Sequence, residues 1–193
     1  MSCVIRDFTA TTFVVQGGRT LLLRHKKLGL WLPPGGHIDP DELPDDAARR
    51  EVLEESGLEV ELISPRSRLG DVPVLSRPEC ILLEDISDDH QHIDLIYFAR
   101  VTGGSLTISD SEADGYRWCT SDELEAGDIH EDIRRLGQQA ISKVTSFEGA
   151  EPLARPNAVA DDVLSLIGQT PTVLLARMAS AGGADIFAKL EFL

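Results

Sequence analysis

The chain has 193 residues, of which 42% are hydrophobic and 26% charged, and its formal net charge is −15 because 33 acidic residues outnumber 18 basic ones. This composition predicts a globular protein with room for one catalytic domain and a short additional segment. So acidic a surface repels polymeric nucleic acid and anionic membranes, and we expect neither as a partner.

The sequence also argues against secretion and membrane insertion. No apolar run approaches the length that spans a bilayer, and Arg6 and Asp7 stand where a signal peptide would need apolar residues. The cysteines, Cys3, Cys80 and Cys119, are odd in number and lack paired metal spacing, which indicates neither a disulfide framework nor a zinc site. We therefore expect a cytoplasmic protein with reduced thiols.

The first part of the chain predicts a β-hairpin. Residues 8–16 and 19–25 are rich in β-branched and apolar side chains, which favours two strands. Gly17 and Gly18 lie between them, and two adjacent glycines are typical of a two-residue hairpin turn.

A helix is predicted over about residues 43–56. Pro44 suits a first helical turn, and Asp45 and Asp46 complement the positive end of the helix dipole. Gly57 can adopt the left-handed conformation that ends a helix.

Further strands follow this helix. Residues 58–63 alternate apolar and acidic side chains, which is typical of a half-buried strand. Strands are also predicted at 79–86, 93–101 and 116–119, and the glycines at 103–104 predict a turn.

Two helices complete this part of the chain. Residues 120–123, Thr-Ser-Asp-Glu, resemble a capping box and predict a short helix at 122–126. Residues 130–147 carry apolar side chains at helical spacing, which predicts an amphipathic helix. Strands and helices in this order predict an α/β fold in which helices enclose a mixed sheet.

Three glutamates of the first helix are predicted to share one face. Glu51, Glu54 and Glu55 stand at positions i, i+3 and i+4. Their charges repel one another unless a cation neutralises them, and a hard divalent ion suits carboxylate oxygens. We therefore expect this face to bind Mg²⁺, with Mn²⁺ as an alternative.

Neighbouring residues are suited to organise these carboxylates. Arg50 can hold Glu42 or one of the helix glutamates through a forked, charge-assisted contact. Gly35 and Gly36 lead into the helix, and two adjacent glycines let the backbone approach a phosphate or a metal ion closely.

Residues 36–58 contain a longer pattern, which consists of Gly36, five residues, Glu42, seven residues and the run Arg50-Glu51-Val52-Leu53-Glu54-Glu55-Ser56-Gly57-Leu58. Seven fixed identities and two apolar positions coincide by chance at on the order of one start position in 10⁸. The pattern resembles the signature of the Nudix hydrolases, and the likeness covers about residues 4–147. It implies an α/β/α sandwich with a mixed sheet.

The resemblance also implies roles for single residues. Glu51, Glu54 and Glu55 would be metal ligands, with the carbonyl of Gly36 nearby, and Glu42 and Arg50 would brace them.

Glu112 is a further candidate that the resemblance suggests. It lies six residues before Trp118, where many family members carry a glutamate that binds metal or activates water. A solvated loop residue is the alternative, and Asp110 and Asp114 are neighbouring contenders.

Histidines form another set of candidates. His90 and His92 flank one residue just before a strand, so alternation places both rings on one face. They have the chemistry to bind a metal ion, but no third ligand is in view, and we interpret them as polar residues at a strand edge. His37 follows the glycine pair and is a candidate for phosphate contact.

The last part of the chain differs from the rest. Residues 148–160 contain proline, glycine and charge without periodicity, which predicts a linker. Residues 161–193 resemble the amino-terminal start of the cysteine synthase family of pyridoxal-phosphate enzymes, on Leu166-Ile167-Gly168, Thr170-Pro171 and Ala188-Lys189-Leu190-Glu191. The match ends before that family's cofactor-bearing lysine, and Lys189 is not at its position, so we expect no pyridoxal phosphate. A fusion remnant, a truncation and an ordinary extension remain open.

These observations predict Mg²⁺-dependent hydrolysis of a nucleoside diphosphate linked to another group, a small nucleotide-type substrate. The proton acceptor would be Glu112 or one of the helix glutamates. A catalytically silent nucleotide-binding or regulatory module of the same fold and the amino-terminal fragment of a fused cysteine synthase-like enzyme are the alternatives. A homodimer is left open.

Overall fold

The computed structural model describes residues 4–149, 159–160, 172–174 and 187–189. The chain divides into two compact units, Met1–Glu148 and Gly149–Leu193. All of the predicted catalytic residues belong to the first unit.

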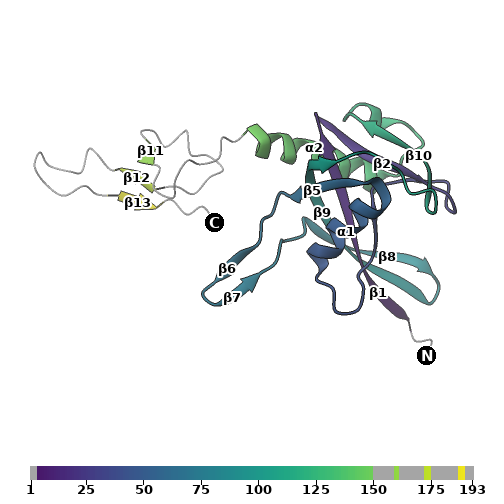
Figure 1. Cartoon of the computed structure of the whole chain (residues 1–193), viewed down its shortest axis with the longest axis horizontal. Coiled ribbons are helices and arrows are strands. Elements are labelled where there is room, and N and C mark those ends of the chain that lie inside the picture. The colour runs from purple at the N-terminus through teal and green to yellow at the C-terminus, as the bar shows by residue number, and fades with distance from the viewer. Residues whose placement is uncertain (1–3, 150–158, 161–171, 175–186, 190–193) are drawn as a thin grey trace, which may run out of the picture. The chain divides into compact units, whose positions relative to one another are not determined.

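The first unit is built on an 8-stranded mixed sheet (Figure 1). Its path runs β10-β2-β1-β9-β5, while β3 pairs with β2, β4 with β1, and β8 with β9. The pairing of β1 with β9 is parallel and the others in this sheet are antiparallel. The strands are β1 (Ile5–Gln16), β2 (Arg19–His25), β3 (Trp31–Leu32), β4 (Gly35–His37), β5 (Leu58–Leu62), β8 (Cys80–Ser87), β9 (His90–Gly104) and β10 (Ala113–Cys119). A separate two-stranded ribbon consists of β6 (Ser67–Leu69) and β7 (Val72–Val74).

Two helices, α1 (Pro44–Ser56) and α2 (Glu131–Gly149), pack on the sheet. Ala47 and Ala48 of α1 join a buried cluster with Ala10 of β1. On the other side, Phe13 of β1 shares a cluster with apolar residues of α2 that include Val144. Alternate residues of a strand face opposite sides, so the helices cover opposite faces of the sheet. The predicted α/β sandwich is therefore confirmed.

The predicted hairpin is present, and β2 has the predicted bounds. Gly17 and Gly18 have φ of 56° and 73°, values that a tight hairpin turn requires and that glycine adopts without strain. Strands β1 and β9 are longer than predicted because they pair with each other from Ile5 to Val15 of β1.

The turn predicted at residues 103–104 is wrong. Gly103 and Gly104 are the last residues of β9 and pair with Glu59 and Leu58 of β5. A side chain at Gly104 would overlap the carbonyl oxygen of Gly57, and its φ is 81°. Glycine is needed there for close approach of two backbones rather than for a turn.

The ends of the predicted helices are largely correct. Helix α1 begins at Pro44, and its last turn closes at Gly57, whose φ is 69° and whose N–H donates to the Leu53 carbonyl. The capping box is confirmed, since Thr120 and Glu123 exchange hydrogen bonds of 2.8 and 3.3 Å. It opens a single 3₁₀ turn, η1 (Glu123–Glu125), rather than an α-helix.

In the second unit the described residues form three short strands, β11 (Val159–Ala160), β12 (Thr172–Leu174) and β13 (Phe187–Lys189). Strands β11 and β12 are parallel, and β13 is antiparallel to β12. Apart from these strands, the predicted linker at 148–160 and extension at 161–193 lie almost entirely outside the described residues. No helix in the described part of the chain is long and apolar enough to cross a membrane.

Candidate active site

Strand β4 places the glycine pair against helix α1. It pairs antiparallel with β1, so Gly36 lies beside Ala10 and Gly35 beside Thr11. A side chain at Gly36 would come within 2.5 Å of the Glu51 carboxylate, and one at Gly35 within 2.8 Å of the backbone of β1. Only glycine allows the loop to approach both the sheet and the glutamate this closely.

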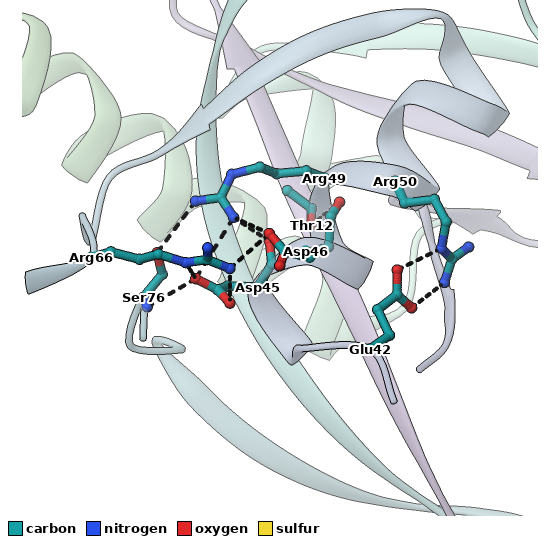
Figure 2. A network of polar contacts seen from close by, with 9 residues as sticks. Thr12, Glu42, Asp45, Asp46, Arg49, Arg50, Arg66 and Ser76 are labelled. Atoms are coloured by element: carbon teal, nitrogen blue, oxygen red, sulfur yellow. Dashed lines mark hydrogen bonds and ion pairs between the residues drawn. The ribbon is translucent and has the colours of Figure 1, made fainter. Parts of the chain in front are cut away.

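Arg50 lies at the centre of the charged contacts on this face of α1. Its guanidinium donates to both carboxylate oxygens of Glu42 (Figure 2), and each of these hydrogen bonds is 2.8 Å long. It also donates to the carbonyl of His37 at 3.0 Å. It also contacts Glu51 at 2.7 Å and Glu54 at 3.1 Å. The hydrogen bonds from Arg50 lower the pKa of Glu42. One cation thus holds three carboxylates of the predicted site in fixed positions.

The remaining carboxylates are crowded. The Gly35 N–H donates to Glu55 at 3.3 Å, and the Glu55 side chain hydrogen-bonds Glu112. Burial, followed by the hydrogen bond and charge of Glu112, raises the pKa of Glu55 to about 9. Burial also raises the pKa of Glu51, and Arg50 only partly opposes it. Burial and the neighbouring Glu112 thus disfavour the charged form of Glu55.

The structure thus brings Glu112 to the glutamates, and it does not do so for the neighbouring aspartates. The Asp114 carboxylate lies 3.9 Å from Arg24, and the Asp110 carbonyl accepts a hydrogen bond from Lys26. Glu54 is the outlying member of the helix set, since 59% of its side chain is exposed.

A cleft of about 690 Å³ opens beside these residues. Its lining combines the glycine pair, the signature residue Glu51 and the loop residue Glu112 with side chains from β1, β2, β8 and β9. It consists of Thr9, Thr11, His25, Lys27, Gly35, Gly36, His37, Asp39, Glu51, Glu84, His92, Asp94, Ser111 and Glu112. A small polar molecule that enters the cleft would meet the crowded carboxylates directly.

A model of the NUDIX domain matches residues 3–139. The chain belongs to the Nudix family. A Bacillus subtilis (strain 168) protein named "Putative 8-oxo-dGTP diphosphatase" is 32% identical over 120 residues, which cover 61% of this chain and 70% of that protein. A Streptomyces ambofaciens MutT-like protein is 27% identical over 146 residues, which cover 76% and 79% of the two chains.

Solved structures agree with this assignment. A NUDIX-family hydrolase from Clostridium perfringens is 34% identical, with a TM-score of 0.66 over 73% of this chain and 99% of that chain. A MutT NUDIX hydrolase from Burkholderia pseudomallei shares the fold at 21% identity, with a TM-score of 0.54 over 72% and 98% of the two chains. The chain is therefore a Nudix hydrolase, and the resemblance predicted for residues 4–147 is confirmed. The likeness of residues 161–193 to cysteine synthases stays a prediction.

The donor set of this Nudix hydrolase fits a hard divalent cation. Glu51, Glu55 and Glu112 converge beside the Gly36 backbone, and the guanidinium of Arg50 is already engaged by Glu42. Oxygen donors with excess negative charge are the ligands that Mg²⁺ and Mn²⁺ prefer.

The sequence prediction missed two carboxylates of the cleft. Asp94 of β9 is 4% exposed and accepts a 2.9 Å hydrogen bond from Thr9 of β1. Glu84 of β8 lies on the same face, and burial together with Asp94 and Asp132 raises its pKa to about 6. The sequence did contain a signal that could have identified Asp94, because it is an isolated aspartate within an otherwise apolar strand.

It also missed a buried ionic network at the start of α1. Asp45 is completely buried and receives hydrogen bonds of 2.6 and 2.8 Å from Arg66 and of 3.1 Å from the Ser76 N–H (Figure 2). Burial alone would raise the pKa of Asp45, but these contacts outweigh it and lower the pKa to about 2. The network ties α1 to the segment between β5 and β8, and thereby fixes the helix that carries the glutamates.

Proposed function

We propose that this Nudix hydrolase performs Mg²⁺-dependent cleavage of the diphosphate in a nucleoside diphosphate linked to another group, and that it acts in the cytoplasm. The observation that carries the proposal is the crowding of Glu55 against Glu112, which lines a cleft together with Glu51 and the glycine pair. Uncompensated carboxylates that open to a cavity are typical of a site for a metal-bound anionic substrate.

Five residues would hold the metal, namely Glu51, Glu54, Glu55, Glu112 and Gly36 through its carbonyl. When bound, Mg²⁺ neutralises the diphosphate and makes a coordinated water more acidic. Arg50 and Glu42 keep the helix carboxylates in place, because both guanidinium edges of Arg50 are occupied by carboxylate or carbonyl oxygens. Their role in catalysis is positioning.

A carboxylate accepts the proton of the attacking water. Glu112 is the first candidate because it lies in the cleft and contacts Glu55, and the helix glutamates are the other candidates. Two carboxylates in hydrogen-bonding contact readily hold one proton between them, which suits a transient acceptor. The products would be two phosphorylated fragments.

The substrate class includes nucleoside triphosphates, in which the second group is a phosphate. The name of the Bacillus subtilis relative makes 8-oxo-dGTP a specific candidate. The cleft offers Lys27 for a phosphate and hydrogen-bonding groups of Thr9, Glu84 and Asp94 for the rest of the molecule. This polar wall favours a ligand with many donors and acceptors over an apolar one.

The test is hydrolysis of a substrate panel with Mg²⁺ in ¹⁸O-labelled water. The panel contains 8-oxo-dGTP, unmodified nucleoside di- and triphosphates, ADP-ribose and dinucleoside polyphosphates, and the label in the products identifies the phosphorus that is attacked. Turnover should depend on Mg²⁺ or Mn²⁺ and fall sharply in Glu55→Gln. The control Glu131→Gln removes a glutamate charge whose side chain is 61% exposed on α2, and should keep wild-type rates.

The two alternatives predict different results. A catalytically silent module would bind nucleotides without turning over any member of the panel, and the intact charged residues of the site argue against it. A fragment of a pyridoxal-phosphate enzyme would show a visible cofactor absorbance band in the purified chain. We expect turnover and no such band.

A further inference from the structure

A second group of metal-binding side chains lies beside the signature site. Asp7 of β1, His37 of β4 and His92 of β9 each place one donor atom within 4.8 Å of the others. The parallel pairing of β1 with β9 sets Asp7 beside His92, and β4 sets His37 beside Thr9, two residues farther along the same face of β1. Three strands thus bring together residues that are distant in the sequence.

These side chains are incompletely satisfied. The Nε2 atom of His92 is buried and has no hydrogen-bond partner among the residues that the structure describes. Leaving a buried polar atom unpaired is unfavourable, so the arrangement favours a ligand that engages the ring. Burial lowers the pKa of His92, which favours the neutral imidazole that coordinates metals.

His90 supplies an outer partner. Its Nε2 lies 2.9 Å from Oδ2 of Asp7, and the Nε2 of His37 lies 4.0 Å from the same oxygen. Hydrogen bonds of this kind orient the ligands of metal sites and keep a carboxylate in one rotamer. The contact with His90 therefore fixes Asp7 while its carboxylate still faces the cluster.

We infer that Asp7, His37 and His92 form a binding site for a divalent transition-metal ion of the zinc class, separate from the glutamate site. Imidazole nitrogens suit Zn²⁺, Ni²⁺ and Co²⁺, whereas Mg²⁺ prefers oxygen ligands. Two histidines and one carboxylate also leave a coordination position for water or a ligand in the cleft. The two sites of the cleft would thus select different metals.

The distances allow such a site after a small adjustment. Donor atoms on one zinc ion lie roughly 3.5 Å apart, so the three groups would need to close by about 1 Å. His37 has room for this movement because 59% of its side chain is exposed. The cluster also opens to the cleft, since both His37 and His92 line it, which gives an ion a path of entry.

The test is a calorimetric titration of the full chain, freed of any histidine tag and dialysed against a chelator. Zn²⁺ is added in the presence of excess Mg²⁺, which occupies the oxygen ligands of the signature site. We expect one Zn²⁺ per chain, and a parallel Co²⁺ titration should give the visible absorption of a nitrogen- and oxygen-coordinated ion. Absence of Zn²⁺ binding to the wild-type chain would overturn the inference.

Matched variants locate the ion. His37→Gln, His92→Gln and Asp7→Asn should each weaken Zn²⁺ binding at least about 10-fold, whereas the control His130→Gln removes an exposed histidine and should have no effect. Thermal unfolding without metal checks that each variant is folded. If His92→Gln is unstable, His37→Gln still tests the site, because His37 is exposed and its substitution should not disturb the fold. Equal affinity in His37→Gln and His130→Gln, or loss of binding only in Glu55→Gln, would contradict the site. Zn²⁺ binding requires no turnover, so the result is independent of the proposed hydrolysis.

Discussion

Helix α1 carries two acidic regions that differ in how their charges are balanced. At its start, the fully buried Asp45 is bound by Arg66 and Ser76, and its pKa is lowered to about 2. Farther along, the half-buried Glu55 meets Glu112, and its pKa is raised to about 9. The two carboxylates share a helix and both lose solvent, so their partners rather than burial alone decide their charge.

This difference separates a structural role from a functional one. The Asp45 network is complete within the protein, and it fixes α1 against the segment between β5 and β8. The Glu55 region is incomplete, because burial and Glu112 disfavour the charged form of Glu55 at a place where a cation is expected to bind. Proteins tolerate such local instability mainly at functional sites, where a ligand relieves it.

The largest expected effect is the loss of activity in Glu55→Gln. We expect kcat/KM to fall at least about 100-fold, because even the outer partners of metal ligands are worth 10–100-fold. The free energy of unfolding without metal should stay constant or rise, since burial and Glu112 disfavour the charged form of Glu55 and glutamine carries no charge. Steady-state kinetics and urea unfolding measure the two quantities, with Glu131→Gln as the control. Wild-type kcat/KM in Glu55→Gln would show that the Glu55 region has no role in activity.

Asp45→Asn should have the opposite profile. Asparagine keeps the volume but loses the charge that faces Arg66, so we expect the free energy of unfolding to fall by about 2 kcal/mol. The kcat/KM of the folded fraction should change little. Asp46→Asn is the matched control on the same turn, because 48% of the Asp46 side chain is exposed and its contact with Arg66 is worth less than about 1 kcal/mol. Equal losses in both variants would show that burial of Asp45 adds nothing.

Glu42→Gln tests the bracing of the glutamates. Its amide cannot accept both hydrogen bonds that Arg50 now donates at 2.8 Å, so Arg50 should move and disturb Glu51. We expect kcat/KM to fall about 10-fold, with a change in unfolding free energy below about 1 kcal/mol. A loss of stability larger than the loss of activity would place Glu42 with the structural network instead.

The sequence predicted well the parts of this Nudix hydrolase that depend on local patterns. The hairpin glycines, the bounds of α1 and the capping box at Thr120 each need only a few neighbouring residues, and all are found. The signature likewise lies within one segment, so the glutamate face could be predicted without the sheet. Local conformational preferences are strong enough to define these features.

The parts that depend on tertiary contacts were missed. Asp45 was predicted only to complement the helix dipole, because Arg66 is 21 residues away, and Asp94 meets Thr9 across 85 residues. The same limit hid the neighbours of His92, since Asp7 of β1 and His37 of β4 come close to it only in the folded sheet. Gly104 looked like a turn residue because a sequence does not reveal the backbone that packs against it.

Acid unfolding gives the smallest and most specific test of the structural network. The pKa of Asp45 is about 2 in the folded chain and near its ordinary value of 3.8 when unfolded. At pH values between these two pKa values, the folded state therefore binds fewer protons than the unfolded state. The stabilisation is therefore present above about pH 4 and lost as the pH falls toward 2, with a slope below about 1.4 kcal/mol per pH unit. Urea unfolding across this range, with a chelator present, should show a steeper loss in the wild type than in Asp45→Asn, while Asp46→Asn follows the wild type. Parallel curves for all three proteins would mean that Asp45 carries no stabilising charge, and the contrast between the two ends of α1 would then rest on the glutamates alone.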